Sequence, residues 1–209
     1  MVHAQHNTFI TNLAHRIVAI PWVYDLVQFL AGAPILIRRL TPVVRRLDRP
    51  AVIVDLGGGT GMFRPVCDPA SKYICLDTDI EKLRGNLRKY RKGLAITADV
   101  TRAPIKDGTV DMALCTNMSH HLDDPAFSGL VSESRRLLKP TGTMLFMDIV
   151  WSPRRRFARL LWKYDRGSNP RTPDALNSVL SSQLTVTERH RFAVYHEYVL
   201  MLGKKPSVG

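Results

Sequence analysis

Between residues 50 and 150 the chain alternates short apolar, β-branched runs with stretches in which apolar residues recur at helical spacing. Runs of the first kind are typical of buried strands, and stretches of the second kind of amphipathic helices. The pattern predicts strands at 51–56, 71–77, 94–100, 110–117 and 142–150, with helices at 80–91 and 124–140. Alternation of strands and helices is typical of an α/β fold with a parallel sheet.

The two ends of the chain have a different pattern. Helical spacing at the N-terminus predicts helices at 8–20, 22–31 and 35–47, and Pro42 lies near the middle of the third, which we expect to be broken there. A basic, aromatic stretch at 151–168 follows the last strand of the central part. A helix at 174–182 and two strands within 184–205, forming a hairpin on the sheet edge, complete the prediction.

The length of 209 residues fits a single domain. We expect three parts within residues 1–209: an N-terminal helical cap at 1–49, a ligand-binding core at 50–150, and cap helices with terminal strands at 151–209. The apolar fraction of 45% excludes disorder as a description of the whole chain.

The net charge is unusual. Thirty Lys and Arg side chains against 18 Asp and Glu give +12, which favours anionic partners such as nucleic acid, an anionic membrane or acidic small molecules. Residues 51–150 carry only +1 of this charge, whereas residues 1–50 carry +4 and residues 151–209 carry +7. The excess therefore lies in the two flanking parts rather than in the central one.

Cysteines and terminal segments bear on the compartment. Cys67, Cys75 and Cys115 form no CxxC pair, which argues against a disulfide framework and against a metal site. No signal-peptide pattern opens the chain, and the apolar stretch 17–37 is interrupted by two prolines and an aspartate. We expect a cytoplasmic protein, and peripheral contact with an anionic membrane is left open. The sequence does not indicate an oligomeric state.

A glycine-rich turn follows the first predicted strand of the central part. Its pattern is Asp55-x-Gly57-x-Gly59-x-Gly61. A P-loop requires a lysine after the glycines, and none is present. A dinucleotide fingerprint requires GxGxxG, but the third glycine position is occupied by Met62 or Arg64 in the two possible frames.

The sequence DLGGGTG resembles motif I of the class I S-adenosylmethionine-dependent methyltransferases. The resemblance continues over residues 50–150, through the spacing of Asp77 and Asp99, the stretch DGTVDMALCTNMSHHLDDP and the stretch ESRRLLKPTGTMLFMD. It implies a Rossmann-like α/β fold, with a seven-stranded, mostly parallel sheet, an antiparallel edge strand and helical caps.

The resemblance also implies S-adenosyl-L-methionine as the cofactor, with S-adenosyl-L-homocysteine as the product. Asp77 would hold the ribose hydroxyls, Asp99 the adenine amino group, and Thr78 and Val100 would contribute backbone groups. The complete implied cofactor set is Asp55, Gly57, Gly59, Gly61, Asp77, Thr78, Asp99, Val100 and Asn117. We expect Asp79 to be the N-cap of the following helix instead of a ligand.

The acceptor site is less defined. The HHLDDP and LLKPTG stretches resemble the small-molecule branch of the family, including enzymes that methylate quinones and secondary metabolites, which implies a small, lipophilic or aromatic acceptor. His120 or His121 is a candidate general base; the alternative is a loop in which one histidine packs and the other is solvated. Candidate acceptor-site residues are Tyr24, Asp148, Trp151 and Tyr164.

Two other functions remain open. The charge favours an RNA or DNA methyltransferase, although the segment Asn117-Met118-Ser119-His120 does not match the [DNS]PP[YF] motif associated with amino-group methylation in this superfamily. A cofactor-binding scaffold without catalytic activity is the second alternative.

Overall fold

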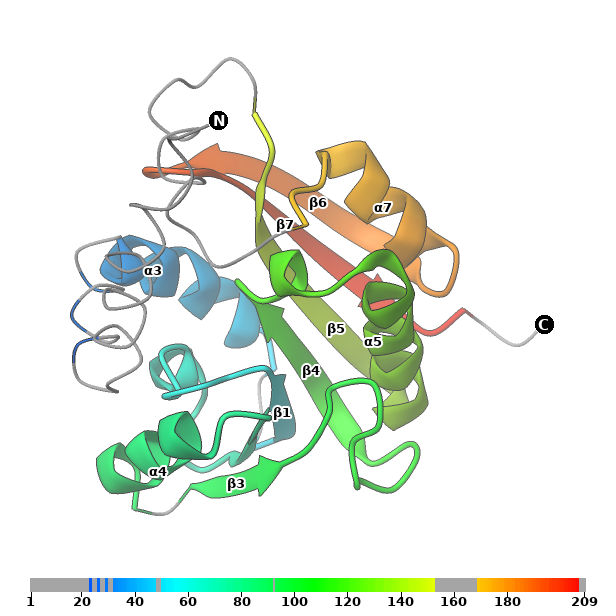
Figure 1. Ribbon diagram of the computed structural model, residues 1–209. Helices are drawn as coiled ribbons and strands as arrows, with labels where there is room; N and C mark the ends of the chain where they lie inside the picture. The colour runs from blue at the N-terminus through cyan, green and yellow to red at the C-terminus, as the bar shows by residue number, and fades with distance from the viewer. Residues whose placement is uncertain are drawn as a thin grey trace, which may run out of the picture.

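The computed structural model describes residues 32–47, 50–91, 93–152 and 169–206, together with Val23, Leu26 and Phe29. Within these residues the strands form one sheet in the order β3-β2-β1-β4-β5-β7-β6 (Figure 1). The strands are β1 (Val52–Leu56), β2 (Lys72–Asp77), β3 (Leu94–Thr97), β4 (Val110–Thr116), β5 (Leu138–Val150), β6 (Thr185–Ala193) and β7 (Glu197–Lys204). The helices are α3 (Ala33–Val44), α4 (Ile80–Lys89), α5 (Asp124–Leu137) and α7 (Pro173–Ser181), with 3-10 turns η1 (Arg64–Val66) and η2 (Ser119–His121).

The first five strands of the sheet are parallel. Strand β1 pairs with β2 on one side and β4 on the other, and β5 pairs with β4. Strand β7 is antiparallel to β5 and forms a hairpin with β6 at the edge. This arrangement confirms the predicted seven-stranded, mostly parallel sheet and the terminal hairpin.

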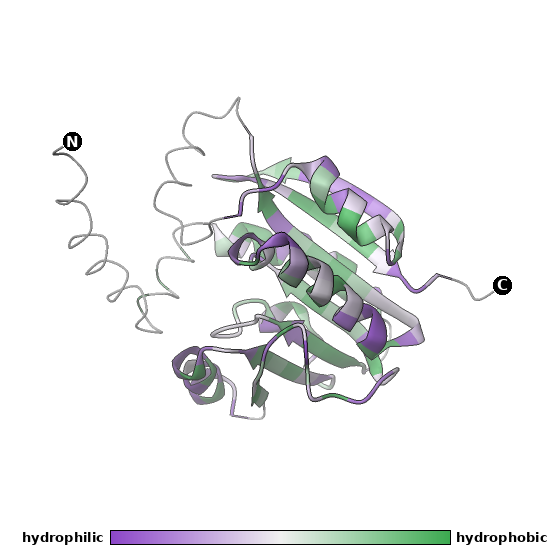
Figure 2. Ribbon diagram, turned by 45° about the vertical axis from the view of Figure 1, so that its right-hand side comes forward, coloured by the Kyte–Doolittle hydropathy of each residue, from purple (hydrophilic) through white to green (hydrophobic). Residues whose placement is uncertain are grey.

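Helices cover both faces of the sheet. Phe127 and Leu130 of α5 and Leu176 of α7 pack with one face, and Leu36 of α3 and Leu83 of α4 pack with the other. Figure 2 shows hydrophobic strands between helices whose outer surfaces are more hydrophilic. Because both faces are covered, β4 is buried at all seven positions and has no polar–apolar alternation.

Helix α3 corrects one prediction. It continues from Ala33 to Val44 through Pro42, which does not break it. Pro42 lies in the last turn, so only one intrahelical bond is lost, and Thr41 Oγ1 donates to the Ile37 carbonyl at 2.8 Å just before it. Pro34 lies in the first turn, where its missing N–H has no helical partner to lose.

Two other boundaries differ from the prediction. Strand β3 ends at Thr97 rather than at residue 100, because Asp99 Oδ1 accepts hydrogen bonds from the Thr101 N–H and hydroxyl and turns the chain. Helix α5 ends at Leu137, and β5 begins at once, because Leu138 pairs with Val110 at the start of β4.

Several expectations concern residues outside the described ranges. They include the helix at 8–20, most of the helix at 22–31, the basic stretch from residue 153 to 168, and the acceptor candidates Tyr24 and Tyr164. Among the described helices, none combines the length and the apolar character needed to cross a bilayer.

Candidate active site

The candidate site lies where the parallel strands β1, β2, β4 and β5 end. Their carboxyl ends share one edge of the sheet, because all four run in the same direction. The chain crosses from β1 to β2 and β3 on one side, then returns to β4 on the other. Ligands of open α/β sheets bind at such a switch point, outside the carboxyl ends of the strands.

The glycine turn that follows β1 has the conformation that its sequence requires. Gly57, Gly59 and Gly61 have φ angles of 75°, 52° and 77°, in the left-handed region that favours glycine. The N–H groups of Gly57 and Gly58 donate to the Leu76 carbonyl at 2.7 and 3.2 Å, and Gly59 N–H donates to Asp77 Oδ2 at 2.9 Å. The turn is thus fixed against the end of β2.

Close packing adds a second requirement for glycine. A Cβ at Gly61 would lie 2.4 Å from Asn86 Nδ2 of α4, and a Cβ at Gly57 would lie 2.8 Å from Met118 Cε. The Gly57 contact also shows that the segment leaving β4 runs directly beside the turn. The β1 turn, α4 and the β4 exit therefore form one packed unit.

Asp55 lies under the turn and is 1% exposed. A Cβ at Gly58 would lie 2.6 Å from its carboxyl carbon, and the Tyr73 hydroxyl donates to its Oδ2. Burial raises the pKa of Asp55 to about 7, with the Tyr73 hydrogen bond acting in the opposite direction and the charge of Asp77 adding to the rise. The buried position of Asp55 against Gly58 indicates that its side chain supports the glycine turn by packing beneath it.

Asp77 ends β2, as predicted, and is partly exposed. Its Oδ2 accepts from Gly59 N–H, and its Oδ1 accepts from Asp79 N–H at 2.9 Å. A carboxylate has about four lone-pair directions, so two are left for a ligand's hydroxyls. Asp79 is the N-cap of α4 and accepts from two N–H groups of its first turn, which confirms that prediction. Thr78, between them, is exposed.

The two residues expected near an adenine differ in burial. Asp99 is exposed, and hydrogen bonds from the Thr101 backbone and hydroxyl hold its pKa below the ordinary value. The Val100 side chain is buried in the core that contains α5. Only its backbone is therefore available for the contact implied by the resemblance.

Asn117 is the first residue after β4 and has a φ of 52°, the positive value of a non-glycine residue. Its N–H donates to the Met147 carbonyl at 2.8 Å. Its side-chain Oδ1 is buried and, within the part of the chain that the structure describes, accepts no hydrogen bond. A strained residue with an unsatisfied acceptor at this edge of the sheet indicates a place for a ligand's donor.

A buried acid–base pair follows Asn117. The His120 Nδ1 lies 2.6 Å from Oδ1 of Asp148, at the end of β5, and both side chains are almost fully buried. Asp148 Oδ2 accepts from the Ser119 N–H at 2.7 Å and from the Ser119 hydroxyl. Burial opposes the charge of Asp148, but His120 and these hydrogen bonds outweigh burial and lower the pKa of Asp148.

Asp148 is a candidate acceptor-site residue from the sequence. In the structure its carboxylate is turned toward Ser119 and His120, and it is 0% exposed. His121 is exposed, and its ring centre lies 4.3 Å from that of His120. The structure thus brings His120 and Asp148 together and leaves His121 on the surface.

Sequence reasoning missed Arg171. Its guanidinium donates to the carbonyls of Ser119 and Leu122 at 2.9 and 2.8 Å and pairs with Asp124 at 2.7 Å. Arg171 stands between the basic stretch and α7, where no motif distinguishes it from other arginines. Only the fold brings it to η2.

The same neighbourhood brings the end of β5 together with the residues that precede α7. Trp151 N–H donates to the Arg171 carbonyl at 2.9 Å, and Asn169 N–H donates to the His120 carbonyl at 3.0 Å. Trp151 is 36% exposed beside this pair. It therefore lies close to the site, and its contact with an acceptor stays a prediction.

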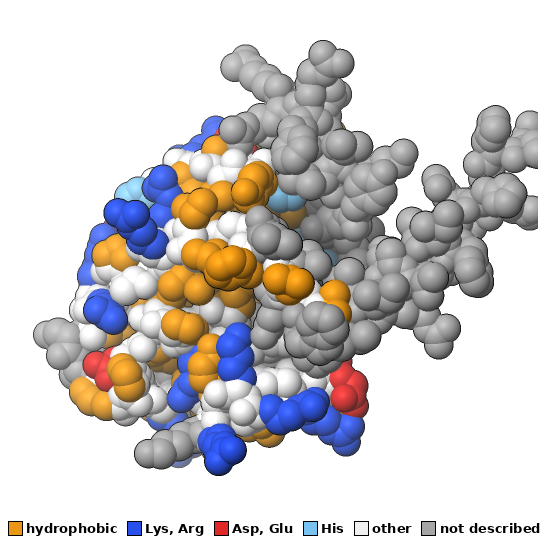
Figure 3. Space-filling view, turned by 90° about the vertical axis from the view of Figure 1, so that its left-hand side faces the viewer, with side chains coloured by type: hydrophobic (Ala, Val, Ile, Leu, Met, Phe, Trp, Pro, Cys, Tyr) orange, Lys and Arg blue, Asp and Glu red, His pale blue; other side chains and the backbone are white. Residues whose placement is uncertain are grey.

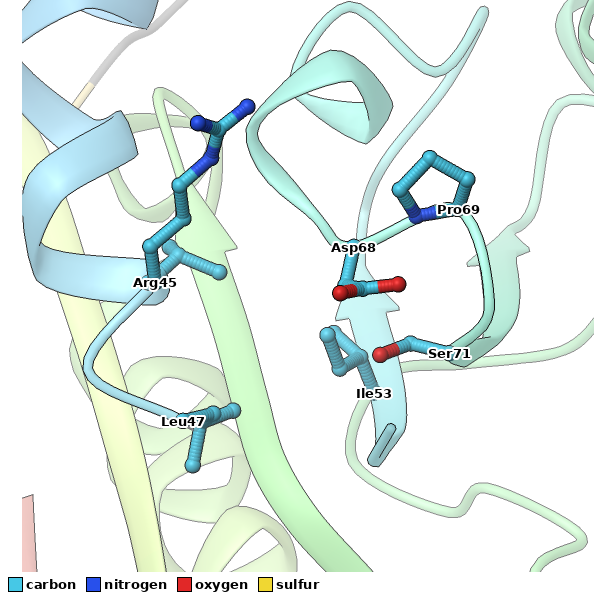
Figure 4. Close-up of a pocket in the computed structure, with 7 residues that line it drawn as sticks. Arg45, Leu47, Ile53, Asp68, Pro69 and Ser71 are labelled. Carbon is cyan, nitrogen blue, oxygen red and sulfur yellow. The ribbon is translucent and has the colours of Figure 1, made fainter. Parts of the chain in front are cut away.

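A cavity of about 270 Å³ lies at the other edge of the sheet. Figure 4 shows Arg45 and Leu47 on one side of it, Asp68, Pro69 and Ser71 on the other, and Ile53 of β1 between them. The Ser71 hydroxyl accepts a hydrogen bond from Ala51 N–H at 3.0 Å, before β1 begins. The cavity is therefore separate from the glycine turn.

Residues 54–146 match the sequence model of a methyltransferase domain family. An uncharacterized methyltransferase of Mycobacterium sp. (strain JLS) is 28% identical over 100 residues, which cover 47% of this chain and 39% of that protein. The chain thus spans about two fifths of the length of the curated relatives that it matches.

Two solved structures resemble the fold. A Burkholderia thailandensis 1,6-didemethyltoxoflavin-N1-methyltransferase, with its substrate and S-adenosylhomocysteine bound, is 18% identical with a TM-score of 0.70, covering 95% of this chain and 89% of that one. A geranyl diphosphate C-methyltransferase from Streptomyces coelicolor is 14% identical with a TM-score of 0.61, covering 75% and 74%.

Proposed function

Because residues 54–146 form a methyltransferase domain and the chain has the class I methyltransferase fold, we propose that it binds S-adenosylmethionine and transfers its methyl group to a small acceptor. The observation that carries this proposal is the link between the glycine turn and Asp77 at the switch point of the sheet. It supports a cofactor site at this switch point, because part of the carboxylate is left for a ligand.

The residues present fit this cofactor. The turn has no lysine, which suits a zwitterionic amino acid and a ribose better than a pyrophosphate. The free lone pairs of Asp77 suit a vicinal diol. The unsatisfied Oδ1 of Asn117 suits a donor such as an ammonium group. Thr78 follows Asp77, and Val100 follows β3. Their backbone groups suit contact with the adenine of the cofactor.

When bound, S-adenosylmethionine supplies a methyl group already activated on a positively charged sulfur. The chain then has to hold the acceptor in line with that methyl group and exclude water. We expect the turn and Asp77 to hold the cofactor. The segment from Asn117 to His120 lies beside the turn, and we expect the acceptor to bind next to this segment.

A calorimetric titration with S-adenosylmethionine tests cofactor binding. Asp77→Asn removes the charge that accepts the ligand's hydrogen bonds, and we expect a loss of about 1–3 kcal/mol in binding free energy. Asp79→Asn is the matched control, because it removes a charge two residues away and keeps a residue suited to capping a helix. Equal losses in both variants, or no binding by the native chain, would contradict the proposal.

A small, lipophilic or aromatic acceptor is the finer part of the proposal. Toxoflavin precursors and geranyl diphosphate are the acceptors of the two similar structures, and both are small molecules. Transfer of a radioactive methyl group to extractable small molecules, compared with transfer to RNA and DNA, tests this choice. Label recovered in nucleic acid alone would refute it.

The basic surface of the molecule supports an acceptor that is found at an anionic surface. Arg38 and Arg39 on α3 and Arg45 and Arg46 just after it are exposed, and Arg46 pairs with Glu188 of β6. Figure 3 shows the face that lies at the left of Figure 1, where Lys and Arg side chains are interspersed with hydrophobic ones. We propose peripheral binding to an anionic membrane. Cosedimentation with anionic but not neutral vesicles at physiological salt is the expected result; salt-resistant RNA binding without vesicle binding would contradict it.

A further inference from the structure

Four side chains near the glycine turn form one buried hydrogen-bonded unit. They are Ser119 and His120 of η2, Asp148 of β5 and Arg171, which precedes α7. Each is 9% exposed or less. Buried polar groups need partners, and this unit supplies them from three separate parts of the chain.

The hydrogen bonds determine how His120 is protonated. Asp148 Oδ1 faces the Nδ1 of His120, and its other oxygen already accepts two hydrogen bonds from Ser119. A carboxylate only accepts, so Nδ1 carries the proton, and a neutral ring has its lone pair on Nε2.

Arg171 holds the segment that carries His120. It donates to the carbonyl of Ser119, the first residue of η2, and to that of Leu122, the residue after η2. The guanidinium makes both contacts from one rigid plane. The Asn169 N–H, two residues before Arg171, donates to the His120 carbonyl. The ring of His120 is therefore fixed both through Asp148 and through the backbone that Arg171 holds.

The unit also lies next to the proposed methyl-transfer site. Met118, two residues before His120, packs against Gly57 of the turn. Among the described residues, the charged or titratable groups that contact His120 or the η2 segment include Asp148 on β5, His121 on η2 and Arg171, which pairs with Asp124 at the start of α5.

We propose that His120 accepts a proton from a hydroxyl group of the acceptor, and that Arg171 is the positioning residue that orients it; this rests on the proposed function. The hydroxyl proton passes to Nε2, an oxygen electron pair forms the bond to the methyl carbon, and the carbon–sulfur bond breaks. That bond's electron pair returns to sulfur, which becomes a neutral thioether. The Asp148 carboxylate stabilises the imidazolium that results.

The chemistry favours a hydroxyl acceptor. A neutral amine attacks with its own lone pair and needs no base beforehand, whereas a phenol with a pKa of about 10 is mostly un-ionised near neutral pH. A base at the site is therefore most useful to a hydroxyl. General-base catalysis contributes about 100-fold or more to such a rate.

The protonation of the ring is tested first, by NMR of the chain labelled with ¹⁵N-histidine, with the His120 signal assigned from His120→Gln. We expect the Nδ1-protonated tautomer in the native chain. We expect the other tautomer or a mixture in Asp148→Asn, a shifted His120 signal in Arg171→Met because the η2 backbone loses its support, and a smaller shift in Arg171→Lys. An Nε2-protonated native ring, or a signal unchanged in Arg171→Met, would overturn the proposal.

Arg136 provides the control for Arg171. It holds the loop after β3 in the same way, donating to the carbonyls of Ala103 and Ile105, but from the middle part of the chain. Arg136→Met should therefore lower stability without changing the His120 signal. A change of that signal in both variants would show general destabilisation and would count against a specific role of Arg171.

The acceptor chemistry is tested with a series of small phenols, from dinitrophenols that are ionised at the assay pH to unsubstituted phenols that are not. We expect His120→Gln to lose about 100-fold or more on un-ionised phenols and little on ionised ones. Equal losses over the series, or no methylation of any phenol by the native chain, would refute a hydroxyl acceptor. Calorimetry with S-adenosylmethionine separates this from failure of the proposed function, which would abolish cofactor binding itself.

Discussion

Replacement of Gly61 by alanine tests the packing of the glycine turn against α4. Two penalties act on the substituted residue. The φ of 77° is unfavourable for a residue with a Cβ, and that Cβ would lie 2.4 Å from Asn86 Nδ2 in a fully buried position. The side-chain amide of Asn86 must therefore move, and with it the contact between the turn and the helix.

The chain provides a control that separates the two penalties. Gly108 has a φ of 66°, but a Cβ there would meet no atom within 4 Å. Gly108→Ala should therefore cost about 1–2 kcal/mol from backbone conformation alone. Gly61→Ala should cost the same amount plus about 1–3 kcal/mol for overpacking.

Urea denaturation of both variants and of the native chain measures these costs. In the double variant Gly61→Ala/Asn86→Ala the steric penalty should disappear, so the two substitutions should show favourable coupling of about 1 kcal/mol or more. Equal costs for Gly61→Ala and Gly108→Ala, or additive costs in the double variant, would refute the packing argument. Binding of S-adenosylmethionine should weaken in Gly61→Ala and remain unchanged in Gly108→Ala.

Three further predictions concern single side chains. Because the pKa of Asp55 is raised from 3.8 to about 7, the folded chain retains a proton that the unfolded chain loses. Stability relative to Asp55→Asn should therefore fall by about 4 kcal/mol as pH rises from below 4 to above 7, measured by urea denaturation at several pH values. Asp79→Ala removes the cap of α4 and should lower the free energy of unfolding by about 1 kcal/mol, whereas Asp79→Asn should not. Leu130→Ala empties a fully buried position and should cost about 2–5 kcal/mol; a smaller loss would contradict the described core.

The sequence predicted the sheet and the turn well because these depend on local chemistry. Strand β4 is an apolar run without alternation, and the glycines of the turn occupy positions that require a positive φ. Asp79 was recognised as a helix cap from its place before an amphipathic stretch. In each of these cases the cause lies within a few residues of the effect.

The acid–base unit depended on long-range contacts and was predicted only in part. His120 and Asp148 were both candidates, but their pairing joins residues 28 positions apart. Arg171 had no local signal at all, because its contacts with η2 span about fifty residues. The ends of β3 and α5 were misplaced for a related reason, since a side-chain turn at Asp99 and strand pairing at Leu138 outweighed the local pattern.

The hydrogen bond between Trp151 and Arg171 brings the departure and the return of the chain to the same point at the end of β5. Because Asn169 also donates its N–H to the His120 carbonyl, the residues on both sides of positions 153–168 are held at the site by hydrogen bonds of their own. Insertions or exchanges confined to positions 153–168 should therefore leave the pairing of His120 with Asp148 intact.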